Sequence, residues 1–355
     1  MLKRLTELFP PPSFLTRPAV GLDISDRSIK FVELGGRRNR PLWIRHGTAL
    51  LPPGAIEAGV IKDAKIVTQV LIDLAKQEKL EYVITALPEE QVYVLELDLP
   101  KVKMSQLRES IELSVGDYLR FPVAEAVLDF ELLPDLRPDD AWLPAVATVL
   151  PMTVAKAYAD VLLAAGLQPL AFELEPQALA RALLPASQET MMIIDIGKVR
   201  TSFYVATNRV IRHSATIDTV SGDILTQVLE RQLELSNSEA ETSKIKQGLT
   251  GDEKVSTALK PIAILLADET EHRLTAWTHD SHQSLPRTEV KQIVLIGGQS
   301  TLVGLPAFLE SRLNVPVVIG HPWKDYLVAD ELPPVPFNQL ASLATATGLA
   351  LRNLW

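Results

Sequence analysis

Two short stretches of the sequence each place an aspartate at the end of an apolar strand, directly before a polar turn. VGLDISDRSIKFVEL starts at Val20 and carries Asp23, and MMIIDIGKVRTSFYV starts at Met191 and carries Asp195. Apolar and polar residues alternate after each turn, which predicts a strand and therefore a β-hairpin. Asp and Gly are also ordinary turn residues, so a purely structural role is the alternative. The repetition favours a duplicated architecture in which both Asp-tipped turns face one cleft.

Turns of this kind can hold a phosphate chain and a metal ion. Phosphate binds to inward-pointing backbone N–H groups with little side-chain bulk around them, and the turns 24–28 and 196–201 are candidates. Mg²⁺ prefers one or two carboxylates together with phosphate oxygens and water, so Asp23 and Asp195 are the candidate ligands, acting through water. Gly297 and Gly298, between a predicted strand and a helix, would let a base or ribose approach the backbone closely.

The composition is that of an ordinary globular protein. The chain has 355 residues, 47% hydrophobic and 22% charged, which is long enough for two domains. The absence of cysteine excludes disulfides and thiolate zinc sites. A net charge of −9 argues against nonspecific nucleic-acid binding. No apolar run reaches the roughly 18 residues of a membrane helix, and the N-terminus does not resemble a signal peptide. We therefore expect a soluble, cytoplasmic protein.

Apolar periodicity predicts the elements that position the two turns. A third strand and a helix follow the first hairpin, and the apolar run YVITALP predicts a buried parallel strand. A change of pattern then marks an inserted region. The predicted elements are strands 43–50, 82–88, 92–100, 127–133 and 145–150, and helices 67–77, 105–121, 153–165, 175–184, 223–248 and 254–277, followed by a strand–Gly-Gly–helix unit and a closing helix.

The predicted helical region 223–248 carries its own start and end signals. SNSE predicts a capping box between Ser236 and Glu239, and Gly248 predicts the helix end. Glu241 and Lys244 are three residues apart and so face the same way. An exposed ion pair is the alternative to a binding role for these two residues.

The order of the hairpins, the capped helix and the Gly-Gly turn resembles that of the actin/hexokinase/heat-shock ATPase superfamily. Within that superfamily the sequence is most similar to the bacterial FtsA/PilM branch, and there to its PilM-like members, which act in type IV pilus assembly. The resemblance covers residues 18–352. The stretches that carry it are VGLDISDRSIKFVEL, YLRFPVAEAVLDFELL, LLAAGLQPLAFELEPQALARAL, SEAETSKIKQGL, QIVLIGGQSTLVGLPAFLESRLNVPV and GLALR.

The resemblance implies an α/β, actin-like two-lobe ATPase fold with a duplicated mixed sheet and an FtsA/PilM-type inserted subdomain. The implied division is an N-terminal arm (1–17), subdomain 1A (18–89 and 166–188), inserted subdomain 1C (90–165), subdomain 2A (189–222 and 289–355) and subdomain 2B (223–288).

The resemblance also implies a site for ATP and Mg²⁺ between the lobes. Glu175, at the start of a helix, falls where relatives place a side chain that orients the attacking water; an ordinary N-terminal helix carboxylate is the alternative. The other implied residues are those of the first phosphate loop (Asp23, Ser25, Lys30), the second phosphate loop (Asp195, Gly197, Thr201), the turn opening the second lobe (Ser221, Gly222), the ribose and base pair (Glu241, Lys244) and the adenosine loop (Gly297, Gly298, Ser300).

The sequence departs from the family pattern at several residues, and Asp26 and Arg27 add bulk to the first phosphate loop. Ser25 and Ser221 stand where glycine is usual, and Lys198 and Arg200 stand where small residues are common. Serine adopts positive φ less cheaply than glycine, and two flexible cations crowd the second turn. We therefore expect ATP to be bound but hydrolysed slowly or not at all, below about one turnover per minute. Weak nucleotide binding, and cations that assist the phosphate charge, are open alternatives.

The resemblance implies a cytoplasmic ATP-binding platform that binds the N-terminal tail of a PilN-like inner-membrane protein. The tail would lie between residues 18–89 and 90–165, and the protein would be membrane-associated through that partner. The strand VYVLELDLP is a candidate edge for the peptide, unless it only covers its own helix. The alternatives are an FtsA-like cell-division filament protein, a small-molecule kinase of the hexokinase branch, and a PilM-like module of a type II secretion or competence system. FtsA-like proteins end in an amphipathic membrane helix, kinases need a substrate-side aspartate base, and secretion modules are normally fused to a membrane span. None of these features is evident in the sequence, so the pilus platform is favoured.

Overall fold

The computed structural model describes residues 19–37, 40–133, 142–279, 287–322 and 335–354. Both predicted hairpins are confirmed. In the first, β1 (Val20–Ile24) pairs with β2 (Ser28–Arg37) so that Asp23 lies opposite Lys30. In the second, β11 (Thr190–Ile196) pairs with β12 (Thr201–Thr207) so that Asp195 lies opposite Ser202. The predicted N-terminal arm, residues 1–17, lies outside the described residues.

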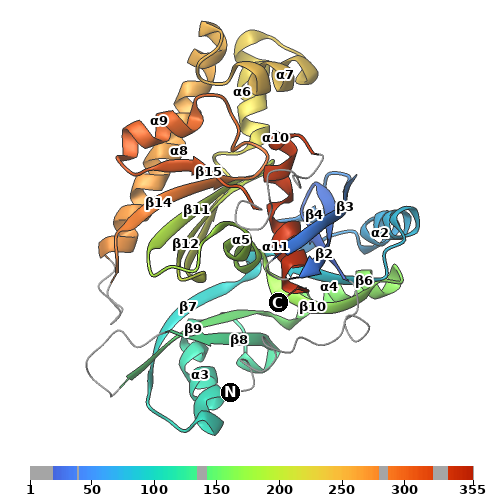
Figure 1. Cartoon of the computed structure of the whole chain (residues 1–355), viewed down its shortest axis with the longest axis vertical. Coiled ribbons are helices and arrows are strands. Elements are labelled where there is room, and N and C mark those ends of the chain that lie inside the picture. Colours follow the sequence, from blue (N-terminus) through green and yellow to red (C-terminus); the bar gives the residue numbers. More distant parts are fainter. Residues whose placement is uncertain (1–18, 38–39, 134–141, 280–286, 323–334, 355) are drawn as a thin grey trace.

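Two five-stranded mixed sheets are built around these hairpins in the same order. The first sheet runs β10-β6-β1-β2-β3 and the second β15-β14-β11-β12-β13. In each, the first strand of the hairpin pairs in parallel with a later strand, β6 or β14. The predicted duplicated mixed sheet is thus confirmed (Figure 1). The further strands are β3 (Arg40–Leu50), β6 (Tyr82–Leu87), β10 (Gln168–Leu174), β13 (Val210–Ile217), β14 (Val290–Ile296) and β15 (Val317–Ile319), with a small β4 (Ile56–Glu57) and β5 (Val60–Ile61) hairpin.

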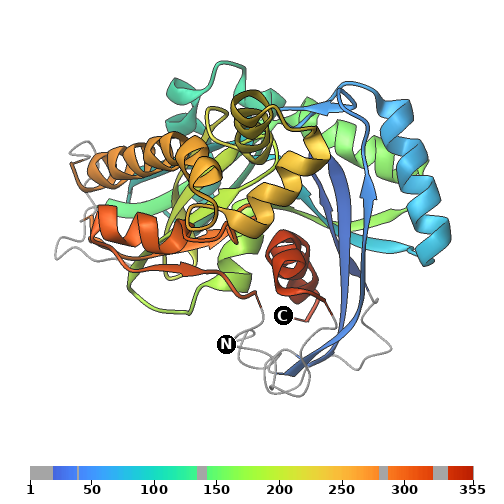
Figure 2. The ribbon, with the colours of Figure 1, turned by 90° about the horizontal axis from the view of Figure 1, so that it is seen from above.

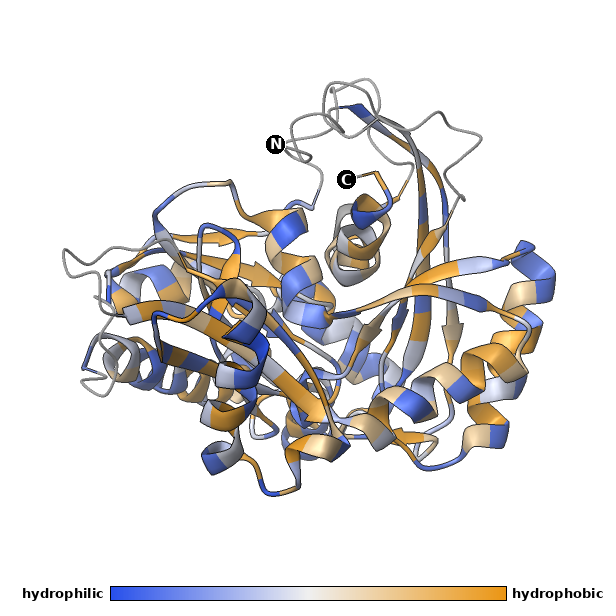
Figure 3. Ribbon diagram, turned by 90° about the horizontal axis from the view of Figure 1, so that it is seen from below, coloured by the Kyte–Doolittle hydropathy of each residue, from blue (hydrophilic) through white to orange (hydrophobic). Residues whose placement is uncertain are grey.

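Amphipathic helices cover one face of each sheet and close its core. In α2 (Ala64–Glu78), the buried residues Val67, Leu71 and Leu74 recur at helical spacing. The helix begins at Asp63, whose side chain accepts hydrogen bonds from two first-turn N–H groups. Strand residues are mainly apolar, whereas the outer helices mix apolar and polar residues (Figure 3). The helices over the second sheet are α6 (Gly222–Leu233), α7 (Asn237–Gln247), α8 (Glu253–His279) and α9 (Leu305–Leu313).

The predicted helical region 223–248 is divided into α6 and α7. Glu234 adopts a left-handed conformation that ends α6, and Ser236 caps α7 in the predicted capping box with Glu239. Gly248 ends α7 with a φ of +53°, as expected for a glycine at this position. The chain therefore turns between two helices that pack against each other.

Two helices lie between the sheets, α5 (Glu175–Leu183) and α11 (Ala344–Arg352), the latter preceded by the short α10 (Phe337–Leu340) (Figure 2). α11 packs against α5, β1 and β2. A Cβ atom at Gly348 would overlap the backbone oxygen of Ala178, and one at Gly21 would overlap that of Ala346. The sequence grouped this helix with the second lobe, whereas glycine contacts seat it on the first sheet.

The inserted region forms a three-stranded sheet of order β7-β9-β8, covered by α3 (Leu107–Val115). The predicted helix 105–121 is therefore shorter than expected, and 3₁₀ turns follow it. α4 (Met152–Ala164) buries Tyr158 and Leu162 in the core of the first lobe, although the sequence assigned it to the insertion. The strands are β7 (Tyr93–Pro100), β8 (Ala126–Leu132) and β9 (Trp142–Pro151). Within the described ranges, no helix has the length and apolar character to cross a membrane.

Candidate functional site

A cavity of about 330 Å³ lies between the two sheets, at the hairpin tips. The carboxyl ends of two parallel strand pairs, β1 with β6 and β11 with β14, meet there. In open α/β sheets, this crevice is where ligands bind. The predicted residues that line the cavity are Asp23, Ser25, Lys30, Glu175, Asp195, Gly197, Gly298 and Gly297.

The two hairpin tips have the same backbone geometry. The N–H of Ser25 donates to the carbonyl of Ser28 at 3.0 Å, and the N–H of Gly197 donates to that of Arg200 at 2.9 Å. Ser25 is not among the described non-glycine residues with positive φ, so its backbone is not in the left-handed region. The expectation that serine strains this position is therefore wrong, since the turn closes without a left-handed residue.

Among the described residues, the cavity lining carries six carboxylates, from Asp23, Asp26, Glu89, Glu90, Glu175 and Asp195, and four cations, from Arg27, Lys30, Lys198 and Arg200. Lys30 donates from Nζ to Asp23 Oδ2 at 3.1 Å. Burial alone would lower the pKa of Lys30, but Asp23 and the other carboxylates raise it. Burial, followed by repulsion from Glu89, raises the pKa of Glu175 well above its usual range and that of Asp195 to about 7. The excess of negative charge is what a bound cation would neutralise.

The donor set fits a hydrated magnesium ion. Among the described residues, no three His, Cys, Asp or Glu side chains converge closely enough to coordinate a metal directly. Asp23 and Asp195 come from equivalent positions of the two hairpins, and both line the cavity. Mg²⁺ commonly keeps several of its waters and uses few protein carboxylates, so this arrangement is compatible with the predicted water-mediated site.

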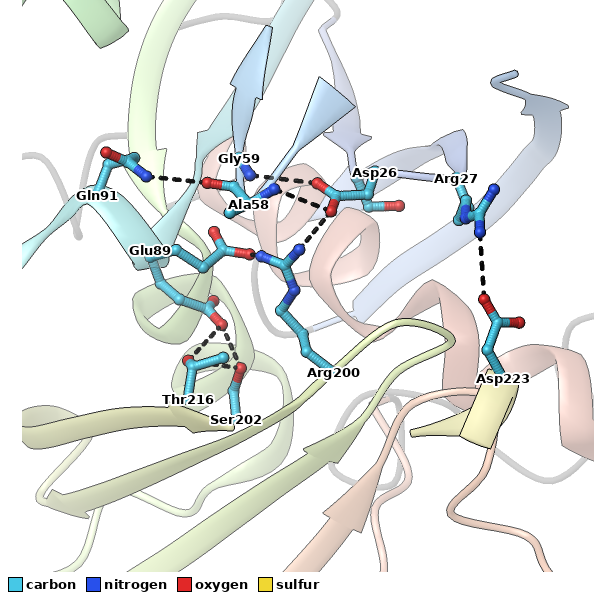
Figure 4. A network of polar contacts seen from close by, with 12 residues as sticks. Asp26, Arg27, Ala58, Gly59, Glu89, Gln91, Arg200, Ser202, Thr216 and Asp223 are labelled. Carbon is cyan, nitrogen blue, oxygen red and sulfur yellow. Dashed lines mark hydrogen bonds and ion pairs between the residues drawn. The ribbon is translucent and has the colours of Figure 1, made fainter. Parts of the chain in front are cut away.

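Polar contacts join the two lobes across the mouth of the cavity (Figure 4). Arg200, at the second hairpin tip, forms ion pairs with Asp26 of the first tip and with Glu90 after β6. Arg27 in turn pairs with Asp223 of α6, with 3.2 Å between Nη2 and Oδ2. The guanidinium of Arg200 is thus held by first-lobe carboxylates.

The sequence pattern marked Asp26 only as bulk in the first turn and gave Glu89 and Glu90 no role. Asp26 also accepts hydrogen bonds from the N–H groups of Ala58 and Gly59, at 3.1 and 3.2 Å. Glu89 and Glu90 follow Pro88 directly after the buried strand β6. Two acidic residues at the carboxyl end of a parallel strand were a usable signal, because that end faces the crevice.

Three predicted residues brace the cavity from behind and do not line it. Thr201 donates from Oγ1 to the carbonyl of Val220 at 2.8 Å, and Ser300 donates from Oγ to that of Gly297 at 2.8 Å. The N–H of Gly222, at the start of α6, donates to the carbonyl of Gly197 at 2.9 Å. These bonds hold the second tip, α6 and the Gly-Gly turn together.

Glu241 and Lys244 also lie outside the lining, in a network between α6 and α7. Lys244 is only 1% exposed. Its Nζ donates to the carbonyl of Gly222 at 3.1 Å, to Thr226 Oγ1 at 2.8 Å and to Glu241 Oε1 at 2.9 Å. All three ammonium protons are therefore used within the protein. The two residues form the ion pair considered as the alternative, but its lysine is buried, and a ribose contact stays a prediction.

Glu175 is the first residue of α5, and its side chain lies in the cavity lining. Its Oε1 accepts a hydrogen bond from Thr345 Oγ1 at 3.2 Å, which ties it to the start of α11. Position and raised pKa fit a group that could exchange a proton with a water in the cavity. The predicted water-orienting role stays a prediction.

Replacing Arg200 with alanine is expected to lower the free energy of unfolding by about 2 kcal/mol or more, because two largely buried carboxylates lose their partner. The side chains of Arg200, Asp26 and Glu90 are at most 18% exposed. Urea unfolding without ligand measures the change. Lys291→Ala, which breaks an exposed pair with Glu289, is the control and should leave the midpoint unchanged. An equal response of the two variants would show that Arg200 does not fasten the lobes.

The chain is similar to known proteins over nearly its whole length. The family model described as "Type IV pilus assembly protein PilM" matches residues 21–354. Among solved structures, the "PilM-PilN type IV pilus biogenesis complex" has a TM-score of 0.79 at 24% identity, over 96% of this chain and 99% of that one.

Two more distant structures share the fold. The ethanolamine utilization protein EutJ from Carboxydothermus hydrogenoformans has a TM-score of 0.55 at 18% identity, over 99% of this chain and 96% of its own. MreB5 of Spiroplasma citri bound to ADP has a TM-score of 0.55 at 11% identity, over 94% of this chain and 95% of its own. Together with the duplicated sheets, these likenesses confirm the actin-like fold.

Proposed function

The chain belongs to the PilM family of type IV pilus assembly proteins, and on that premise we propose that it is an ATP-binding platform that grips the N-terminal tail of a PilN-like inner-membrane protein. The observation that carries the proposal is the family match over residues 21–354. The partner is suggested by the similar structure, which is a PilM–PilN complex. The family match does not favour an FtsA-like filament, a hexokinase-type kinase or a secretion module. We place the protein at the cytoplasmic face of the membrane, held there by its partner.

We propose that ATP with Mg²⁺ binds in the cavity between the hairpin tips. Asp23 and Asp195 would hold the hydrated cation, and Lys30, already turned toward Asp23, would face the phosphates. When bound, the ion would neutralise the excess of carboxylates. The similar MreB5 structure contains ADP, which supports a nucleotide in this fold.

We propose that the partner peptide lies between the first lobe and the insertion. β7, the strand first considered for peptide addition, is an edge of the inserted sheet, but its Glu96 is buried against Arg212 of the second lobe. β8 is the other edge, and its residues 127, 129 and 131 are exposed in alternation. A half-exposed edge strand can accept an extended peptide, so β8 is the better candidate.

Calorimetric titration of the partner's N-terminal tail peptide tests the platform function. We expect a saturable one-to-one complex with the wild-type protein, because a preformed sheet edge orders only the peptide. A scrambled peptide of equal composition is the control and should give no specific heat. No binding of the native peptide, with or without nucleotide, would remove the platform proposal.

Turnover is expected to stay below about one ATP per minute, against typical enzyme rates of 1–10³ per second. Fast hydrolysis needs a water held in line with the phosphate. Glu175 is the candidate to orient it, but its hydrogen bond from Thr345 also suits a structural role. A phosphate-release assay measures the rate. Turnover of several per second, lost in Glu175→Ala, would make the protein a working ATPase.

A further inference from the structure

Glu89 is a buried carboxylate in the cavity to which neither the sequence nor the family resemblance gave a role. It opens the 3₁₀ turn Glu89–Gln91, which follows β6 and leads into the insertion. Its side chain lines the cavity, although the residue is only 7% exposed. A charged group this far from bulk water requires compensation from its surroundings.

One oxygen of Glu89 is satisfied by the second lobe. Oε1 accepts hydrogen bonds from Ser202 Oγ and, at 3.4 Å, from Thr216 Oγ1. Both donors are on the second sheet, so Glu89 crosses the cleft (Figure 4).

The other oxygen of Glu89 is not satisfied. Oε2 is buried and has no hydrogen-bond partner of normal geometry among the described residues, although the Glu175 carboxyl and the Tyr204 hydroxyl lie near enough to Glu89 to interact with it. Most buried polar groups in native proteins are hydrogen-bonded, so an orphaned carboxylate oxygen in a cavity lining points to a ligand that supplies the missing contact. A proton shared with Glu175 is the competing explanation, and it would leave the magnesium dependence of ATP binding unchanged in Glu89→Gln.

The charges around Glu89 indicate the sign of that ligand. Asp23, Glu175 and Asp195 line the same cavity, which also holds four cationic side chains among the described residues, those of Arg27, Lys30, Lys198 and Arg200. Three of these are already paired: Lys30 with Asp23, Arg27 with Asp223, and Arg200 with Asp26 and Glu90. Repulsion from Glu89 is also the largest charge effect that raises the pKa of Glu175 and Asp195. An anion beside Oε2 would be repelled by these carboxylates, whereas a cation or its bound water would be attracted.

We propose that Glu89 is a third carboxylate of the magnesium site, which takes the missing hydrogen bond of Oε2 from the hydrated cation. The proposal rests on the proposed binding of ATP with Mg²⁺. It adds to Asp23 and Asp195 a residue whose other oxygen is bonded to the second lobe, so the same side chain joins the cation to both lobes.

Glu89→Gln separates a cation-binding role from a structural one. The amide oxygen of Gln can still accept from Ser202, but the charge is lost. We expect the affinity for MgATP to fall about tenfold, which is typical when a residue that hydrogen-bonds a ligand of a metal ion is replaced. The affinity for ATP in EDTA should stay the same or rise, because one repulsive charge has been removed. Without ligand, the melting temperature should stay the same or rise for the same reason.

Glu96→Gln is the matched control, since it makes the same substitution at another buried glutamate. Glu96 lies between Arg212 and Arg287, with 2.5 Å from Arg212 Nε and 2.9 Å from Arg287 Nη1 to Oε1. Its neutralisation weakens two buried ion pairs, so the melting temperature should fall while the MgATP affinity is kept. Glu89→Asp keeps the charge and should retain the preference for ATP with magnesium.

The titrations distinguish failure of the inference from failure of the proposed function. If the wild-type protein does not bind MgATP at millimolar concentration, the nucleotide proposal fails and the role of Glu89 falls with it. If the wild type binds and Glu89→Gln binds MgATP equally well, only the inference is overturned. An equal loss of affinity with and without magnesium, together with a lower melting temperature, would also overturn it, because that pattern indicates a structural role.

Discussion

Replacing Asp195 with alanine is expected to abolish the stabilisation of the protein by MgATP. A ligand that binds only the folded state adds about 2.7 kcal/mol to the free energy of unfolding at a hundredfold excess over its dissociation constant. Asp195 lies at the end of β11, in the cavity lining, opposite the equivalent Asp23. Without its carboxylate, the hydrated cation loses one of the side chains proposed to hold it, so the cation that would neutralise the phosphates is bound less tightly.

Thermal melts with and without millimolar MgATP measure this effect. Asp73→Ala, on the exposed side of α2, is the control and should keep the full ligand-induced shift. A wild-type protein whose melting temperature does not move, or an Asp195→Ala variant that responds like the wild type, would exclude the assigned site.

Replacing Gly348 with alanine is expected to lower the free energy of unfolding by about 3 kcal/mol or more. The added Cβ would overlap the backbone oxygen of Ala178, and neither backbone is free to move without displacing α11 from α5. Overpacking of a close-packed core commonly costs about 1–3 kcal/mol and occasionally more. We expect a value at or above the upper end here, because no side-chain rotation can relieve an overlap with a backbone oxygen. Arg181 also donates to the carbonyl of Gly348 at 2.8 Å, which would be disturbed.

Urea unfolding of Gly348→Ala measures this loss. Gly116→Ala, at the end of α3, is the control because its Cβ would meet Val123 at an ordinary 3.7 Å. Its midpoint should differ little from that of the wild type. If Gly348→Ala is equally stable, the close packing of α11 against α5 is wrong.

Local patterns in the sequence were sufficient to predict the hairpins and the capped helix. Asp23 and Asp195 each stand at the end of an apolar strand, and apolar and polar residues alternate in the strand that follows the turn. Ser236 and Glu239 interact within a single helical turn. Interactions of this range depend on neighbouring residues and on little else, so the sequence around them is informative.

Contacts between distant segments could not be predicted in the same way. The sequence indicated that Arg200 crowds the second turn, with assistance to the phosphate charge as the alternative, but its partner Asp26 lies 174 residues earlier in the chain. The family resemblance implied that α11 belongs to the second lobe, whereas it packs against α5, β1 and β2, with a close glycine contact at Ala178. Only the folded chain brings these groups together.

The pair Glu241 and Lys244 shows how far helical spacing alone can be taken. Spacing correctly predicted that both side chains face the same way, and the ion pair is present at 2.9 Å. It did not predict that Lys244 is buried and uses its remaining protons on Gly222 and Thr226, since both belong to another helix.

A crystal structure of the protein with Mg²⁺ and a non-hydrolysable ATP analogue tests the central claim most directly. The claim is that the two Asp-tipped hairpins form one nucleotide site. We predict the phosphates between the turns 24–28 and 196–201, with the cation reached through water by Asp23 and Asp195. A nucleotide bound elsewhere on the protein, with no phosphate between the two turns at saturating concentration, would contradict the account.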